Sequence, residues 1–359
     1  MKPAAFHGGN IFRASKKLGI PEDEIMDFSA SINPLGMPKG VMKEIKRSLK
    51  NLSHYPDPDV NALSLEIAKH HTLSSESIVC GNGSTELISL IVRALQPKMV
   101  LIPVPTFSEY EKTLQRTGIK GEIGFFPLRE KDTFDINPDR FISALKSKPY
   151  GMVFLCNPNN PTGRLLRKRD VLKIAGAAKA LRIYLVVDEA FMDFAPKESV
   201  LQEVANNPYL IVVRSMTKFY ALAGLRLGYG VFPKRIVNIV KQYKEPWTVN
   251  TLAQKAGIAA LRDSTYAQET FRVFVQEKIF LETSFKKLGI RYIPSSTNYY
   301  LLRFSSAKKV SSQLGKKGIL VRDCSDFRGL ENDSYIRMAV KAHKDNAYLL
   351  KVLSKCREA

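Results

Sequence analysis

The chain has 359 residues, 45% of them hydrophobic and 25% charged, which excludes global disorder and allows a sizeable core spread over about two domains. Its 55 Lys and Arg residues outnumber its 34 Asp and Glu residues, so the formal net charge is +21. This excess predicts an anionic partner: nucleic acid, a membrane surface or a phosphorylated small molecule.

The first 36 residues are rich in Gly, Pro, Asn and Ser and predict an N-terminal arm with one short helix over residues 11–18. They contain no apolar core of signal-peptide length, and no segment of the chain approaches the ~20 apolar residues of a membrane span. The four cysteines form no CxxC pair, and the five histidines form no HExxH or HxxxH pattern. We therefore expect no metal site, no disulfide framework and a reducing, cytoplasmic location.

Residues 37–250 alternate helical and strand-like patterns, as a parallel sheet flanked by helices does. The predicted helices carry apolar residues at helical spacing and cover residues 40–50, 60–70, 85–95 and 168–181. The predicted strands are short, β-branched and unalternating, as buried strands are, and cover residues 77–80, 99–104, 151–156, 183–187 and 210–213. The pattern predicts a large domain over residues 37–250.

After residue 250 the order of elements changes. A long helical region over residues 252–288 precedes strand patterns at 299–304, 319–322 and 335–340 and a terminal helix. This order predicts a smaller C-terminal domain over residues 251–359. The expected fold class is α/β, with a mostly parallel central sheet in the large domain and a smaller α/β domain after it.

Polar residues follow the predicted strands at their carboxyl ends, which is where open α/β sheets bind ligands. Lys218 lies past the strand at 210–213 and is a candidate amine nucleophile, although a lone lysine there is more often a solvated surface residue. Asp188 follows the apolar run at residues 184–187, and a carboxylate buried there needs a partner. It could cap a helix, form an ion pair or hold a ring nitrogen in its protonated form.

A candidate phosphate site lies at the predicted helix that follows a Gly-Asn-Gly turn. Ser84 and Thr85 begin this helix, and Ser215 and Arg226 flank Lys218. Helix N-terminal N–H groups with hydroxyls and one arginine suit a phosphate group, although a glycine-rich turn alone is weak evidence. The two Asn-Pro steps within residues 157–163 fix an irregular turn, which either aims an amide inward or is simply a tight loop.

The joint order of these motifs is more specific than any one of them. Asn-Pro-Thr-Gly comes first, then Asp-Glu-Ala, then Ser-x-Thr-Lys, then an arginine eight residues beyond the lysine, all at predicted strand ends. In this order the chain resembles the fold-type-I pyridoxal-phosphate enzymes of the aminotransferase class, over essentially its whole length. The resemblance implies that pyridoxal 5'-phosphate is the cofactor.

The same resemblance implies roles for individual residues. Lys218 would carry the cofactor, Asp188 would pair with its ring nitrogen, Asn160 would bind its ring oxygen and Phe107 would stack on its ring. The residues implied for its phosphate are Ser84, Thr85, Ser215 and Arg226. Tyr55 would reach the neighbouring subunit's cofactor phosphate, which implies a homodimer with shared sites. Arg337, with Arg322 beside it, would bind the substrate carboxylate.

Two branches of this family match best: the histidinol-phosphate aminotransferases and the L-threonine-O-3-phosphate decarboxylases of cobalamin biosynthesis. The decarboxylase branch is favoured by the His-Gly-Gly-Asn block at residues 7–10, the segment at 27–36, the Pro-Trp-Thr-Val-Asn stretch at 246–250 and Phe191. Phe191 stands where transaminases usually carry a tyrosine, so a donor to the ring oxygen is absent. In a mobile arm His7 could equally be an ordinary histidine, and Phe191 could be a core aromatic.

The implied reaction is decarboxylation of L-threonine O-3-phosphate to (R)-1-amino-2-propanol O-2-phosphate. The candidate ligands of the substrate phosphate are His7, Asn10, Ser31 and Asn33. L-Serine O-phosphate, smaller by one methyl group, is an open alternative substrate. The alternative enzyme is a histidinol-phosphate aminotransferase. A nucleic-acid-binding protein is disfavoured because the basic residues are dispersed and no known binding module is present.

Overall fold

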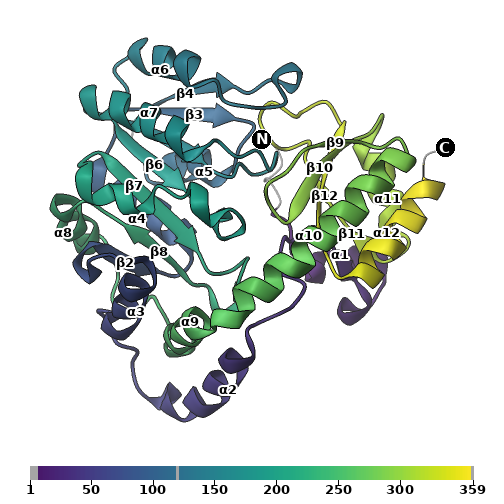
Figure 1. Ribbon diagram of the computed structural model, residues 1–359, viewed down its shortest axis with the longest axis horizontal. Helices are drawn as coiled ribbons and strands as arrows, with labels where there is room; N and C mark the ends of the chain where they lie inside the picture. Colours follow the sequence, from purple (N-terminus) through teal and green to yellow (C-terminus); the bar gives the residue numbers. More distant parts are fainter. Residues whose placement is uncertain (1–6, 119–120, 357–359) are drawn as a thin grey trace.

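The computed structural model describes residues 7–118 and 121–356. Its largest sheet has seven strands in the order β2-β8-β7-β6-β5-β3-β4 (Figure 1). Strand β8 runs antiparallel to both of its neighbours, whereas β7, β6, β5, β3 and β4 run parallel to one another. The strands are β2 (Ile78–Gly81), β3 (Met99–Val104), β4 (Glu122–Pro127), β5 (Met152–Cys156), β6 (Tyr184–Asp188), β7 (Leu210–Ser215) and β8 (Gly228–Val231).

Both faces of this sheet are buried, which explains the unalternating apolar strands. Side chains alternate between faces along a strand, so β5 sends Val153 and Leu155 into one core cluster and Met152 and Phe154 into another. The helices over these faces are α3 (Asn61–His71), α4 (Ser84–Leu95), α5 (Glu109–Arg116), α6 (Pro138–Lys146), α7 (Lys168–Ala180) and α8 (Lys234–Gln242). The mostly parallel α/β architecture predicted from the sequence is confirmed.

The C-terminal unit has its own sheet, in the order β12-β13-β10-β9, with every neighbouring pair antiparallel. Its strands are β9 (Arg291–Ile293), β10 (Tyr299–Arg303), β12 (Arg322–Asp323) and β13 (Tyr335–Ala339). Helices α11 (Ala307–Gly315) and α12 (His343–Lys355) lie beside this sheet, and the long α10 (Ser264–Lys287) reaches from it toward the large sheet (Figure 1). Leu281, Phe285, Tyr300 and Leu349 are among its fully buried core residues.

The N-terminal segment packs on this C-terminal unit. It contains α1 (Ile11–Leu18) and β1 (Met26–Asp27), and β1 pairs in parallel with β11 (Ile319–Leu320). Phe28 is buried in the same core as Ile319. The chain then crosses to the large sheet through α2 (Lys39–Ser48). The arm is therefore built onto the smaller unit, and its later residues reach the large unit, where the N–H of Asn33 donates to the carbonyl of Lys218.

The predicted helical region over residues 252–288 is two helices, α9 (Thr251–Arg262) and α10. Asp263 separates them, and its carboxylate accepts hydrogen bonds from the backbone N–H groups of Thr265 and Tyr266 at the start of α10. Ala253 and Ala256 of α9 are buried in a core cluster of the large sheet. The strand expected at residues 319–322 is likewise divided, because β11 pairs with β1 and β12 joins the smaller sheet. No helix of the described residues has both the length and the apolar character needed to cross a membrane.

Candidate active site

The parallel strands β5, β6 and β7 end at one edge of the large sheet, and the predicted site residues Asn160, Asp188 and Lys218 lie at or just after these ends. The register pairs Cys156 with Asp188 and Asp188 with Val213, so the loops that follow these strands start side by side. Asn160 lies in the loop after β5, and Lys218 follows β7 by three residues. Local sequence patterns placed both polar residues at strand ends, and the parallel register explains why they meet.

Asp188 is buried at the end of β6 and accepts two hydrogen bonds. The hydroxyl of Tyr110 donates to its Oδ2 at 2.7 Å, and the N–H of Ala190 donates to its Oδ1 at 3.0 Å. Burial raises the pKa of Asp188 to about 6, although these hydrogen bonds act against that rise. Tyr110 is itself fully buried and stacks on Phe154 with ring centroids 4.7 Å apart. Tyr110 was not predicted from the sequence. The signal that could have indicated it is its position in the first turn of α5, three residues after Phe107.

Lys218 is held among groups that disfavour its charged form. Burial lowers the pKa of its amine to about 8, the positive charges of Arg337 and Arg226 act in the same direction, and Asp27 opposes them. A substantial fraction of the amine is therefore neutral near physiological pH, as nucleophilic attack on an aldehyde requires.

The predicted phosphate residues surround the first turn of α4. Gly83 precedes Ser84 with φ of +79°, and a Cβ at Gly83 would lie 2.7 Å from Nη2 of Arg226. A Cβ at Gly228 would lie 2.4 Å from the backbone nitrogen of Ser84, and Gly228 pairs with Ser215 in the β7–β8 register. The two glycines thus let a guanidinium group, a hydroxyl and free helix N–H groups converge. Thr85 follows Ser84 in the same turn.

Asn160 and Arg337 contact each other across the two units. The guanidinium of Arg337 donates through Nη1 to Oδ1 of Asn160 and through Nη2 to the carbonyl of Ser29 at 2.7 Å. Its buried Nε has no hydrogen-bond partner among the described residues. The β12–β13 register places Arg322 directly opposite Arg337, so both side chains leave one face of the sheet. Arg322 is bound by both carboxylate oxygens of Asp326 at 2.8 Å.

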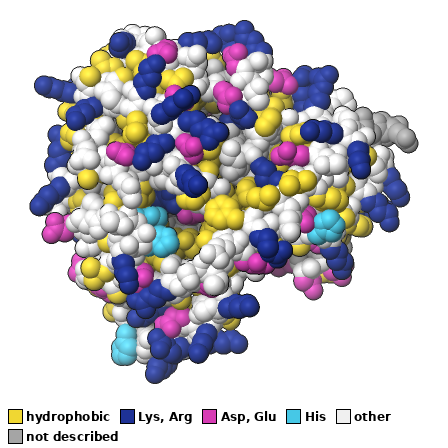
Figure 2. All heavy atoms as spheres, viewed as in Figure 1, with side chains coloured by type: hydrophobic (Ala, Val, Ile, Leu, Met, Phe, Trp, Pro, Cys, Tyr) yellow, Lys and Arg dark blue, Asp and Glu magenta, His cyan; other side chains and the backbone are white. Residues whose placement is uncertain are grey.

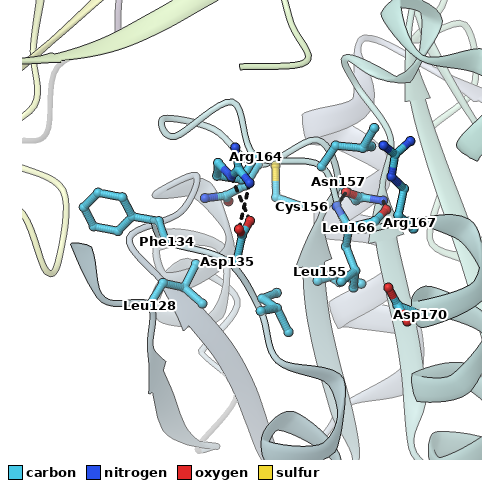
Figure 3. Close-up of a pocket in the computed structure, with 13 residues that line it drawn as sticks. Leu128, Phe134, Asp135, Leu155, Cys156, Asn157, Arg164, Leu166, Arg167 and Asp170 are labelled. Atoms are coloured by element: carbon cyan, nitrogen blue, oxygen red, sulfur yellow. Dashed lines mark hydrogen bonds and ion pairs between the residues drawn. The ribbon is translucent and has the colours of Figure 1, made fainter. Parts of the chain in front are cut away.

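The loop that carries Asn160 is fixed from its outer side. Asn157 exchanges two hydrogen bonds of 2.9 Å with the backbone of Leu166, and Arg164 forms a bidentate pair with Asp135 at 2.7 Å (Figure 3). A cavity of about 250 Å³ lies among these residues. Neither Lys218 nor Asp188 lines it, so it belongs to the outer support of the loop and not to the strand-end site.

The arm approaches Phe107 through His7. The Nε2 atom of His7 lies 2.8 Å from Oε1 of Glu109, and its ring centroid lies 5.8 Å from that of Phe107. The N–H of Gly9 donates to Oγ of Ser29 at 2.7 Å. Hydrogen bonds from His7, Lys112 and Arg116 lower the pKa of Glu109 to about 2, although burial alone would raise it. Glu109 was not among the residues predicted from the sequence.

Two of the other predicted substrate ligands, Asn10 and Asn33, already have structural partners. The side chain of Asn10 caps α1 through the N–H of Arg13, and that of Asn33 donates to the carbonyl of Phe219 and to Oγ1 of Thr270. Ser31 is buried, and its hydroxyl has no partner among the described residues. Of the predicted phosphate ligands, His7 contacts the ring of Phe107, the predicted stacking residue.

Tyr55 and Phe191 have different surroundings. Tyr55 is 81% exposed and stacks on Trp247 with centroids 4.7 Å apart. Phe191 is buried with its ring edge-on to Tyr299, whose hydroxyl donates to the carbonyl of Asn159 at 2.8 Å. Phe191 therefore packs as a core aromatic at the site where the sequence motif placed it.

A family model described as Aminotransferase class I and II matches residues 23–355. The chain belongs to this family. It is 39% identical over 352 residues to threonine-phosphate decarboxylase from Salmonella typhimurium, covering 97% of this chain and 95% of that protein. Its fold matches histidinol-phosphate aminotransferase from Clostridium acetobutylicum with a TM-score of 0.85 and 33% identity, covering 92% of this chain and 98% of that one. It also matches L-threonine-O-3-phosphate decarboxylase from Porphyromonas gingivalis with a TM-score of 0.81 and 28% identity, covering 92% of this chain and 99% of that one.

Class I and II aminotransferase family members use pyridoxal phosphate, and the strand-end site fits that cofactor. It offers an amine with a lowered pKa, a buried carboxylate for a protonated ring nitrogen and a helix N-terminus beside an arginine. Figure 2 shows Lys and Arg side chains spread over the whole visible face, not gathered in one stripe as a nucleic-acid footprint would be. The charge distribution thus agrees with a small anionic ligand in a site.

Proposed function

We propose that this protein decarboxylates L-threonine O-3-phosphate to (R)-1-amino-2-propanol O-2-phosphate, a step toward cobalamin, as a cytoplasmic homodimer. The observation that carries the proposal is the position of the arm. Its Ser29 carbonyl accepts a hydrogen bond from Arg337, and its His7 lies beside Phe107. The site therefore has one position for a carboxylate, at Arg337, and a second, basic position for another anionic group, at His7. A substrate with both a carboxylate and a phosphate fits this arrangement.

We assign to the cofactor-facing residues the roles that the motif implied. When bound, pyridoxal phosphate accepts the electron pair of the bond that breaks at Cα. Asp188 would keep the ring nitrogen protonated, Asn160 would donate to the ring oxygen and Phe107 would cover one ring face. Lys218 would hold the cofactor and return a proton to Cα. Ser84, Thr85, Ser215 and Arg226 would bind the cofactor phosphate.

The substrate-facing residues decide which bond breaks. Arg337 and Arg322 would orient the carboxylate so that its bond to Cα is the one that breaks, where an aminotransferase would present Cα–H. Arg322 must exchange its pairing with Asp326 to take part. At the other end, His7 leads the phosphate contacts, since Asn10 and Asn33 have structural partners. Ser31 contributes only if its buried hydroxyl becomes accessible.

The dimer is supported by the surface around Tyr55. A tyrosine that is 81% exposed and stacked on a half-exposed Trp247 is an apolar feature suited to a partner surface. Tyr55 would then reach the cofactor phosphate of the neighbouring subunit. All four cysteines are buried and unpaired, in agreement with a reducing compartment.

The test is an assay of the purified holoenzyme with threonine phosphate. Carbon dioxide release without 2-oxoglutarate supports the proposal. Glutamate-dependent transamination of imidazole acetol phosphate would instead assign the aminotransferase activity. The ratio of kcat/KM for threonine phosphate to that for serine phosphate then measures how well the site distinguishes the two substrates. A pocket that contacts the additional methyl group is expected to give a ratio of about 10 to 200. Lys218→Ala is expected to abolish both turnover and the visible absorbance of the bound cofactor.

A further inference from the structure

Glu109 is a buried carboxylate with no assigned part in the chemistry. It begins α5, two residues after Phe107, and is 4% exposed. His7 contacts its Oε1 at 2.8 Å, Lys112 contacts the same oxygen at 3.0 Å, and Arg116 pairs with Oε2. A buried carboxylate needs such partners, but two cations from its own helix already provide them. The third partner comes from the arm, 102 positions away in the sequence.

Residues 8 and 9, just after His7, pack against a later part of the arm at Ser29. Gly8 crosses the carbonyl of Ser29 so closely that a Cβ there would lie 2.1 Å from the oxygen, and Gly9 donates to the Ser29 hydroxyl. These contacts fix the backbone on the smaller unit. The contact of His7 with Glu109 is made instead to the large unit, beside Phe107. It therefore decides where the imidazole lies relative to the cofactor-facing residues.

The charges around His7 favour an anion. Lys112 and Arg116 together outweigh the single negative charge of Glu109, so the cluster is net positive even when His7 is neutral. With Nε2 of His7 bound to Glu109, Nδ1 is the ring nitrogen that can face a second partner, and it donates to a phosphate oxygen when the ring carries both protons. A carboxylate on one nitrogen fixes the ring orientation and makes the opposite nitrogen a directed hydrogen-bonding group.

We propose that Glu109 is a positioning residue that holds the His7 imidazole beside Phe107 for the phosphate group of the substrate. The phosphate part of this statement rests on the proposed function, whereas the hold on the arm does not. Glu109 contacts neither the reacting atoms nor the cofactor in this scheme. It acts through His7, and its loss frees the start of the arm.

The experiment compares holoenzymes carrying Glu109→Gln and the matched control Glu111→Gln. Glu111 lies on the same helix and forms a bidentate pair with Arg328 at 2.6 and 3.1 Å. We expect Glu109→Gln to raise KM for threonine phosphate by roughly ten- to a hundredfold, the loss expected for a charged hydrogen bond, while kcat falls much less. Deuterium exchange of residues 7–18 should accelerate in Glu109→Gln, whereas both readouts should match the wild type in Glu111→Gln.

A second variant keeps the test independent of the folding of Glu109→Gln. His7→Gln changes a half-exposed arm residue and should raise KM similarly, and the double variant should be no worse than either single one. Additive effects, an unchanged KM or an unchanged arm exchange in Glu109→Gln would overturn the proposal. If the wild type releases no carbon dioxide from threonine phosphate, the proposed function fails, and the exchange comparison still decides whether Glu109 holds the arm.

Discussion

Tyr110→Phe is the cleanest single change at the site, because it removes one oxygen and keeps the ring. The hydroxyl donates to Asp188 at 2.7 Å, whereas the ring stacks on Phe154 and loses nothing. Asp188 is 2% exposed, so water cannot replace the lost donor without rearrangement. The carboxylate retains only the N–H of Ala190 among its hydrogen bonds in the described residues.

The size of the effect follows from that one hydrogen bond. A hydrogen bond to a charged group contributes about 1.5–3 kcal/mol, and about 1.4 kcal/mol corresponds to one pKa unit. The pKa of Asp188 should therefore rise by roughly one to two from its value of about 6. Because the charged carboxylate is the form that holds a protonated ring nitrogen, the protein should bind the cofactor roughly tenfold less tightly near neutral pH.

The assay is a titration of the apoprotein with pyridoxal phosphate over a series of pH values. Cofactor affinity should fall as pH drops through the pKa of Asp188, because the carboxylate becomes protonated. In Tyr110→Phe this loss of affinity should begin at a higher pH, and affinity should recover in alkaline buffer. Tyr184→Phe, at the opposite end of β6 with its hydroxyl 3.4 Å from Arg235, is the matched control and should leave the limb in place. Superimposable limbs for wild type and Tyr110→Phe would refute the reasoning.

Three further predictions follow from other contacts. The rate at which apoprotein captures the cofactor should rise with pH and level off above about 8, where Lys218 becomes neutral; a rate still climbing near the ordinary lysine value of 10.5 would contradict the lowered pKa. Arg214→Met should destabilise the protein by about 3–5 kcal/mol in urea unfolding, because it leaves Glu189 buried and uncompensated, and adding Glu189→Gln should restore part of the loss. Gly8→Ala should lift the arm, since its Cβ meets the Ser29 carbonyl, and so accelerate arm exchange and raise KM without changing cofactor absorbance; an unaltered exchange rate would count against the described path of the arm.

The features that could be predicted from the sequence are those set by local pattern. Asp188 and Lys218 follow buried apolar runs, and parallel pairing brings the ends of such runs together without further information. The boundary between α9 and α10 at Asp263 could also have been predicted, because an aspartate before Ser-Thr is a typical helix start. It was missed because the apolar residues on both sides keep helical spacing. Short β8 was missed because its Gly-Tyr-Gly-Val sequence lacks the β-branched run that marked its neighbours.

The partners of these residues could not be predicted in the same way. Tyr110 meets Asp188 across 78 positions of sequence, and Glu109 meets His7 across 102. No spacing rule links residues so far apart. The contact of Tyr110 with Asp188 depends on where α5 lies relative to the end of β6, and that of Glu109 with His7 depends on how the arm reaches the large unit. The path of the arm likewise gave Asn33 partners at Phe219 and Thr270, which its polarity alone did not reveal, whereas the cap that Asn10 forms with Arg13 is local.

The attachment of the arm to the smaller sheet has a consequence for how such a protein can diversify. The segment that carries His7 joins the fold through β1 and β11, whereas Asp188 and Lys218 belong to the large sheet. Mutations near His7 can therefore accumulate with little effect on the groups that hold the cofactor, whereas Asn33, farther along the arm, forms hydrogen bonds with the carbonyls of Lys218 and Phe219. Recognition of the substrate phosphate and binding of the cofactor are in this sense assigned to separate parts of one chain. A new recognition group could evolve at the arm while the catalytic apparatus stays intact.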